Sequence, residues 1–302
     1  MRKIDLKIVE ILVGWKCNLA CRDCSSGVDI LRNKIDQEPE LDNLIKSIDD
    51  LSKYVNNVTD LFTVTGGEPM LYWDIVKPVV RHIRKKFPLA KIMINSNGRL
   101  LHKRKDELID FLKEIQNIAI GLSNHASEFP NDPAGQAYYN DLDKFFSDSR
   151  LYKIHSMHYD IPDNEVNFHW GTHSDGFIAQ WKRVGDKLKP FATKNPAKSF
   201  ENGCVSPICA SLSDDSKLYK CFKLQVLPTI LKRIDQLDDP DWQPYLTYQP
   251  IDISKDNVWN DIYKFAEEEG NPISVCDMCP DNKVIGISRV PHTKENIFTK
   301  RK

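Results

Sequence analysis

The sequence predicts an α/β fold, in which a partial parallel (β/α)6 TIM-like barrel precedes a small C-terminal domain. Two observations lead to this prediction. Apolar strands alternate with amphipathic helices over the first 122 residues, as in proteins built from parallel βαβ units. Cysteines then become much denser after residue 196. We therefore expect one domain at 1–195, a second at 196–290 and a mobile tail at 291–302.

The first predicted strand covers 4–13 and is largely apolar on both faces, as expected of a parallel strand that is covered by helices. A helix is predicted at 41–51, because apolar residues recur there at helical spacing and Pro39 suits a first helical turn. The pattern then repeats, with strands at 61–65, 91–94 and 118–122 and helices at 75–83 and 108–115.

The periodicity weakens after residue 123. We predict a helix at 138–146 and strands at 151–158 and 166–170. Residues 190–196, which contain two prolines, an asparagine and a lysine, are predicted to link the two domains. Active sites in barrels of this kind collect at the C-terminal ends of the strands, so polar motifs at those ends are the candidates for a site.

Composition excludes several classes of partner. The 302 residues include 42 Lys plus Arg and 43 Asp plus Glu, so no net field attracts nucleic acid or anionic lipid. No stretch approaches the roughly 18 apolar residues of a membrane span. Lys7 and Glu10 interrupt the apolar start, which also lacks a signal-peptide cleavage site. We expect a cytoplasmic protein with a small-molecule substrate, whose eight cysteines serve metal binding rather than disulfides.

Three of the cysteines, Cys17, Cys21 and Cys24, follow directly on the first predicted strand. Structural zinc usually takes four protein ligands. Three thiolates instead suit a cubane 4Fe-4S cluster held at three irons, whose fourth iron stays open to another ligand. A structural zinc turn or three ordinary thiols is the alternative. The spacing favours a cluster that binds a substrate.

A second motif, Gly66-Gly67-Glu68 followed by Pro69, stands at the end of the second predicted strand. Glycines let the main chain come close to a ligand, and a carboxylate accepts hydrogen bonds from an ammonium group. Alone, the motif would indicate only a tight turn before a helix. Its position about forty residues after the three cysteines, at the next strand end, favours a ligand site.

Together the cysteine trio and the Gly-Gly-Glu-Pro motif resemble the signatures of the radical S-adenosylmethionine (SAM) superfamily. The resemblance implies that SAM chelates the open iron and that an electron from the cluster cleaves it to a 5'-deoxyadenosyl radical. It also implies that Gly66, Gly67 and Glu68 contact the SAM amino group, and that a flavodoxin or ferredoxin donates electrons. Many members have an aromatic residue before the third cysteine, against the adenine. That position is Asp23 here, so the adenine contacts are expected to differ.

Two later strand ends carry further polar residues: Ser96 and Asn97 after the third strand, and Ser123 and Asn124 after the fourth. In the family such positions bind the ribose hydroxyls or the SAM carboxylate. Asn and Ser are also common turn formers, so both interpretations stay open.

Four histidines, His155, His158, His169 and His173, fall in one later stretch. Their irregular spacing makes a second metal site the less favoured interpretation. Some of them are candidates for handling a substrate proton, but the sequence does not select a catalytic residue.

The remaining cysteines are Cys204, Cys209, Cys221, Cys276 and Cys279. A hairpin is predicted from Cys209 to Cys221, with its turn at 214–216. Cys276 and Cys279 form a tight two-ligand turn, which both clusters and zinc use.

This second set resembles the SPASM domain, and more closely its shortened twitch form. The full domain needs about seven or eight cysteines for two clusters, so five imply one auxiliary 4Fe-4S cluster. Cys221, Cys276 and Cys279 are expected as ligands. The hairpin favours Cys209 as the fourth, whereas the longer gap from Cys204 to Cys221 better suits a dehydrogenase with the shortened form. A structural zinc is the alternative to the cluster.

The resemblance predicts an oxidoreductase-like enzyme that abstracts hydrogen from a small polar metabolite, such as a sugar or cyclitol, and oxidises or rearranges it. A substrate radical beside a hydroxyl becomes strongly reducing once it loses a proton, and an auxiliary cluster would accept the electron. The alternatives are a maturase that modifies a ribosomal peptide and a non-enzymatic iron-sulfur redox sensor.

Overall fold

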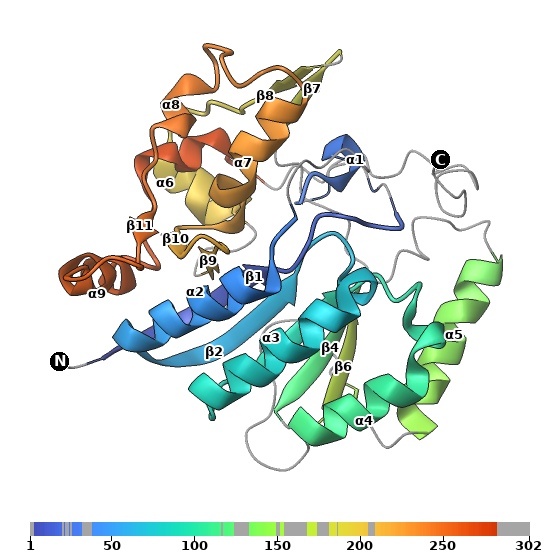
Figure 1. The fold of residues 1–302 in the computed structure, drawn as a ribbon. Coiled ribbons are helices and arrows are strands. Elements are labelled where there is room, and N and C mark those ends of the chain that lie inside the picture. The colour runs from blue at the N-terminus through green and yellow to red at the C-terminus, as the bar shows by residue number, and fades with distance from the viewer. Residues whose placement is uncertain are drawn as a thin grey trace.

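A nine-stranded sheet, in the order β11-β10-β9-β1-β2-β3-β4-β6-β5, runs through the protein in this computed structural model (Figure 1). The structure describes residues 3–19, 21, 24, 26–31, 38–115, 117–123, 133–148, 152–153, 168–173, 181–185, 187–204 and 209–282. The predicted tail at 291–302 lies outside these residues, as do Asp23, Asn124, His155 and His158.

The predicted alternation of strands and helices is confirmed up to residue 123, where neighbouring strands pair in parallel. The elements are β1 (Ile4–Leu12), α1 (Val28–Leu31), α2 (Leu41–Tyr54), β2 (Val55–Thr65), η1 (Pro69–Tyr72), α3 (Trp73–Lys86), β3 (Ile92–Ser96), η2 (Leu101–Lys103), α4 (Lys105–Ile115) and β4 (Ile118–Ser123). β2 begins six residues before its predicted start. Its first half is too polar to show an apolar run, and pairing with β1 makes it a strand.

The far edge of the sheet departs from sequence order. After α5 (Pro133–Asp148), β6 (Phe168–His173) pairs with β4, and β5 (Tyr152–Lys153) lies outside it. β6 pairs with β4 at six positions, and the described part of β5 pairs with β6 at two. Only residues 152 and 153 of the predicted strand at 151–158 lie among the described residues.

The opposite edge extends the sheet with C-terminal strands. β9 (Cys209–Leu212) pairs in parallel with β1, and β10 (Lys217–Tyr219) pairs antiparallel with β9. β11 (Ile251–Asp252) completes this edge. The predicted hairpin is thus confirmed, and Ser216 in its turn has φ 58°. One sheet therefore joins the two predicted domains.

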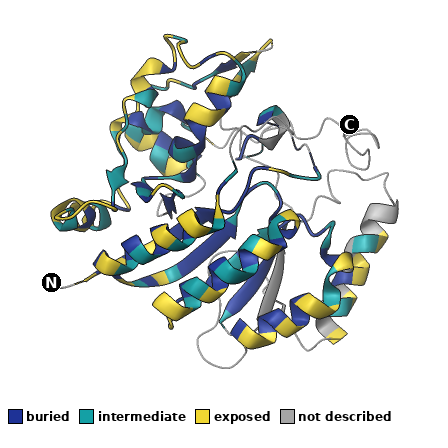
Figure 2. Cartoon of the chain, in the orientation of Figure 1, coloured by how far each residue is buried: buried dark blue, intermediate teal, exposed yellow. Residues whose placement is uncertain are grey.

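Helices α2 to α5 cover one face of the sheet (Figure 1). Alternate strand residues such as Val9, Phe62 and Ile94 point into this main core, which Figure 2 shows as buried strand surface beneath the helices. The residues between them face the other way and form only a small apolar cluster of Ile8, Leu61, Met93 and Ala119. By the same alternation, Glu10 of β1 belongs to this second face, which therefore carries polar groups toward the strand ends.

The rest of the C-terminal region packs around a second apolar core, centred on α7. Its elements are β7 (Lys182–Val184), β8 (Lys187–Lys189), α6 (Pro196–Lys198), the π-helical turn η4 (Ser199–Gly203), α7 (Phe222–Arg233), α8 (Gln243–Leu246) and η5 (Ser274–Met278). α9 (Trp259–Glu267) instead packs against the main core through Ile262. Leu12, the last residue of β1, and Trp15, in the loop that follows it, also belong to this core.

The predicted linker at 190–196 is bonded to this region. The backbone N–H groups of Phe191 and Thr193 donate to the carbonyls of Met278 and Asp277. Residues before the predicted domain boundary therefore pack with residues after it. Among the described residues, no helix is both long and apolar enough to cross a bilayer.

Candidate functional site

The first candidate site is the loop after β1 that carries Cys17, Cys21 and Cys24. The Cys17 sulfur accepts a hydrogen bond from the Leu19 N–H at 3.4 Å, and the Cys24 N–H donates to the Cys21 carbonyl, also at 3.4 Å. Burial, and then the charge of Glu68, raise the pKa of the Cys17 thiol well above its usual range. A thiolate here needs a nearby positive charge, which a bound metal centre would provide.

Two residues distant in sequence hold the start of this loop. The Trp15 N–H donates to Glu38 Oε2 at 3.0 Å, and the Lys16 N–H donates to the Tyr72 hydroxyl at 2.6 Å. The Tyr72 hydroxyl in turn donates to Glu38 Oε2 at 2.8 Å. Sequence reasoning missed Glu38 and Tyr72, because no local motif marks a pair of residues that act together across 34 positions.

The Gly66-Gly67-Glu68 segment lies directly against the cysteine loop. The Gly67 N–H donates to the Gly14 carbonyl at 2.9 Å, and the Glu68 N–H donates to the Lys16 carbonyl at 2.8 Å. A Cβ on Gly67 would stand 2.2 Å from the Lys16 carbonyl oxygen. Glycine is therefore needed for the two strand ends to approach this closely.

Glu68 connects the ends of β2 and β3. Its carboxylate is fully buried and accepts hydrogen bonds from the Met70 N–H (3.0 Å), the Ser96 hydroxyl (2.7 Å) and the Asn97 N–H (2.8 Å). The expected contact with a SAM ammonium group stays a prediction. Within the protein, Glu68 fixes Ser96 and Asn97 beside the cysteine loop, a role that the sequence did not indicate.

Asn97 completes this connection. Its side-chain amide Nδ2 donates to Asn18 Oδ1 at 2.8 Å and lies 3.6 Å from the Cys17 sulfur. Ser123 ends β4, the strand next to β3. The structure thus brings the predicted residues from β2 and β3 together around Cys17.

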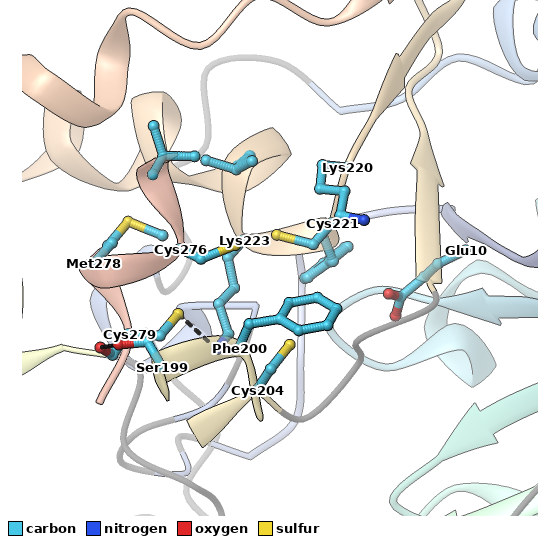
Figure 3. Close-up of a pocket in the computed structure, with 13 residues that line it drawn as sticks. Glu10, Ser199, Phe200, Cys204, Lys220, Cys221, Lys223, Cys276, Met278 and Cys279 are labelled. Carbon is cyan, nitrogen blue, oxygen red and sulfur yellow. Dashed lines mark hydrogen bonds between the residues drawn. The ribbon is translucent and has the colours of Figure 1, made fainter. Parts of the chain in front are cut away.

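The second candidate site is a cavity of about 90 Å³ lined by Cys204, Cys221, Cys276 and Cys279. Figure 3 shows the four cysteines converging from separate segments of the chain. Cys209 begins β9, opposite Ile8 of β1, and its side chain is not among those described. The described cysteines already supply four thiols, and Cys204 is one of them.

A close backbone contact brings two of these segments together. A Cβ on Gly203 would stand 1.7 Å from the Pro280 carbonyl oxygen, so only glycine fits at position 203. The contact brings the residue before Cys204 against the residue after Cys279. The buried Ser199 hydroxyl donates to the Cys279 carbonyl at 3.1 Å. Cys276 and Cys279 are joined by a backbone hydrogen bond within their own turn, at 3.1 Å.

The electrostatics of the cavity suit a bound metal centre. Burial, and then the charge of Cys279, raise the pKa of Cys221 to about 12. Burial also raises the pKa of Cys276. Lys223 donates to the Cys279 sulfur at 3.4 Å, and although burial disfavours its charge, the neighbouring thiols leave its pKa raised. Thiolates are the ligands that iron-sulfur clusters use. Among the described residues, however, no group of three or more His, Cys, Asp or Glu is arranged to hold a single metal ion, so the arrangement does not favour zinc.

Glu10 is a candidate that sequence reasoning had noted only as a break in an apolar stretch. It lines the four-cysteine cavity, and in Figure 3 its carboxylate points from β1 toward Phe200. The signal in the sequence is a charged residue between the apolar Val9 and Ile11, at a position where the structure leaves Glu10 half-buried.

Comparison with known proteins bears on the segment that carries the first of these sites. Residues 11–130 match the family model described as the Radical SAM superfamily, and this segment contains the three cysteines of the loop and Gly66 to Glu68. Molybdenum cofactor biosynthesis protein 1 of Dictyostelium discoideum is 31% identical over 117 residues. These residues are 38% of this chain and 18% of that relative, so the match spans less than a fifth of the relative's length.

Two solved structures resemble the chain distantly. BtrN in complex with AdoMet and 2-DOIA aligns over 92% of this chain and 94% of its own, at 16% identity and a TM-score of 0.41. Histidine-tagged anSMEcpe with bound AdoMet aligns over 86% of this chain and 80% of its own, at 15% identity and a TM-score of 0.43. Similarities this distant carry no argument about ligands or substrates.

Proposed function

Since residues 11–130 match the Radical SAM superfamily model, we propose that the protein is a radical SAM enzyme that oxidises a small polar metabolite, such as a sugar or cyclitol. In this proposal residues 196–290 act as a twitch-like domain with one auxiliary 4Fe-4S cluster. A flavodoxin or ferredoxin would serve as the electron donor.

The convergence of four thiols on one cavity is the observation that carries the proposal. Four thiolates complete the coordination of a 4Fe-4S cluster, so no iron would be left open for a substrate. A site of this kind is suited to accepting an electron. A two-electron oxidation needs such an acceptor, whereas a rearrangement does not.

The chain's own residues would hold these groups in defined places. Cys17, Cys21 and Cys24 would bind the first cluster, and Cys204, Cys221, Cys276 and Cys279 the second. When bound, the clusters and SAM supply a 5'-deoxyadenosyl radical, which takes a hydrogen atom from the substrate, and an acceptor for the electron released on oxidation.

Glu10 is suited to take the accompanying proton. Conversion of a CH–OH group to a carbonyl releases one hydrogen atom, one proton and one electron. The Glu10 carboxylate belongs to the polar face of the sheet and also lines the four-cysteine cavity. It is therefore placed to accept the hydroxyl proton on the side where the electron leaves.

The polar face also offers a means of binding hydroxyl groups. Asn95 on β3 has a buried side-chain oxygen without a hydrogen-bond partner among the described residues. A buried acceptor of this kind is costly unless a ligand donates to it. A polyhydroxylated substrate would supply that donor, which supports a sugar or cyclitol over an apolar compound.

The test is to replace Cys276 and Cys279 by alanine in the full chain and to assay it anaerobically with SAM, dithionite and a panel of free sugars and cyclitols. The wild type should bind about eight irons, and the variant about four. The variant should still form 5'-deoxyadenosine and methionine but lose the oxidised product. Undiminished product would exclude the second site as the electron acceptor. Absence of 5'-deoxyadenosine from the iron-loaded wild type would favour a redox sensor.

A further inference from the structure

Lys223 is a buried cation at the four-cysteine cavity. Its side chain is 5% exposed, and its Nζ lies 3.4 Å from the Cys279 sulfur. Figure 3 shows the Lys223 side chain descending from α7 among the cysteines, with the contact to Cys279 drawn as a dashed line. Lysine is almost never buried without a partner for its charge, so this placement requires an explanation.

Carboxylates do not provide that partner. Among the described residues, none forms an ion pair with Lys223, whereas Cys279, Cys204 and Cys221 all interact electrostatically with it. The buried ammonium group is thus matched to the thiol set itself. A centre that carries negative charge at this position would compensate it.

The neighbouring buried lysine is oriented differently. Lys220 donates through its Nζ to the backbone carbonyls of Glu268, at 3.1 Å, and Glu269. Lys220 also interacts electrostatically with Cys276, Cys221 and Cys204, but its ammonium group is held by two carbonyls just after α9. Lys223 is the lysine with a described hydrogen bond to a cavity sulfur.

We propose that Lys223 sets the reduction potential of the auxiliary cluster, by donating an N–H···S hydrogen bond to Cys279 and placing a positive charge beside the cluster. The inference rests on the proposed function, because it requires a cluster at this site. Hydrogen bonds to the sulfurs and net charge are two of the main determinants of cluster potential. A cluster becomes more negative when it takes up an electron, so a buried positive charge favours its reduced form.

The test measures this potential directly and needs no turnover. Each variant is made in a full-length chain that also carries Cys17→Ala, Cys21→Ala and Cys24→Ala, so that the auxiliary cluster is the only one present. After anaerobic reconstitution and iron analysis, a redox titration followed by electron paramagnetic resonance gives the midpoint potential. The variants are Lys223→Met, Lys223→Gln, Lys223→Arg and Lys232→Met.

Loss of the charge should lower the potential. In Lys223→Met the equilibrium constant for reduction should fall about tenfold, which is about 59 mV for a one-electron couple. Lys223→Gln keeps an N–H donor without the charge and should also shift downward. If Lys223→Met retains no iron, the midpoint potential of Lys223→Gln serves as the test instead. Lys223→Arg keeps the charge, so its midpoint potential should stay close to that of the parent, the chain that carries only the three cysteine substitutions.

Lys232→Met is the matched control, because it removes an exposed lysine from the same helix, and solvent screens that charge. Its potential should equal that of the parent. An unchanged potential in the methionine and glutamine variants would overturn the inference, as would an equal shift in the arginine variant. If the parent binds no iron at the site, the proposed function fails at that step. If iron binds but the potential does not move, only the role of Lys223 fails.

Discussion

Cys204 completes a set of four thiols around the C-terminal cavity, and its position depends on Gly203 and Pro280. Replacement of Cys204 by serine should remove the auxiliary cluster, so that anaerobically reconstituted protein binds about four irons instead of about eight. Cys209→Ser is the matched control, and it should keep the full iron content. Iron and sulfide analysis of both variants decides between the two cysteines, and loss of iron only from Cys209→Ser would contradict this assignment.

Glu10 is expected to act on the proton rather than on radical formation. Glu10→Gln keeps the size of the side chain but cannot accept a proton, so kcat for the oxidised product should fall roughly 100-fold. Formation of 5'-deoxyadenosine should continue, because the residues around Cys17 are untouched.

A matched control checks that the effect belongs to this position. Glu267→Gln, at an exposed position on α9, should behave as wild type. An unchanged product rate in Glu10→Gln would remove Glu10 from the mechanism.

Among the elements, α2 and the turn between β9 and β10 are joined by a buried polar contact. The Ser216 hydroxyl donates to Asp50 Oδ2 at 2.8 Å, and the Ser216 N–H donates to Ser47 Oγ at 3.0 Å. The contact ties the hairpin that precedes Cys221 to a helix within residues 11–130, the segment that matches the Radical SAM superfamily model. It spans 166 residues of sequence.

Removal of the Asp50 carboxylate should weaken this connection. Asp50→Ala leaves Ser216 without its acceptor and should lower the free energy of unfolding by about 1–3 kcal/mol. The same variant loses the ion pairs of Asp50 with Lys46 and Lys53, which contribute less than buried ion pairs would because both ammonium groups are exposed to water. Asn43→Ala, at an exposed position on the same helix, should change stability by less than about 0.5 kcal/mol in the same denaturant titration.

The Asp50 contribution should also depend on pH. Burial disfavours the charge of Asp50, but hydrogen bonds from Lys46, Lys53 and Ser216 outweigh it and lower its pKa. A lowered pKa in the folded state stabilises the protein above the unfolded value of about 3.9, and this stabilisation is lost as the pH falls further. The difference between wild type and Asp50→Ala should therefore shrink below about pH 4. A constant difference would show that the charge is not involved.

For the molecule as a whole, β1 is the element common to both sites. Its C-terminal end leads into the cysteine loop, one edge pairs with β2 and the other with β9. Leu12 and Trp15 also pack into the C-terminal core. The two sites are therefore built on one continuous framework, which suits a reaction that forms a radical at one site and delivers an electron to the other.

The sequence alone predicted the alternation of strands and helices up to residue 123 and the resemblance to the radical SAM superfamily. Strand and helix periods, the Cys17 to Cys24 spacing and the Gly66-Gly67-Glu68 motif are local signals, because each reflects neighbours along the chain. Only the tertiary structure decided the order of β5 and β6, the continuation of the sheet into β9, and the grouping of Cys204 with Cys276 and Cys279. These features depend on which distant segments pack together. The same holds for the partners of Glu68 and Lys223, because a carboxylate or an ammonium group gives no sign in the sequence of what will surround it once it is buried.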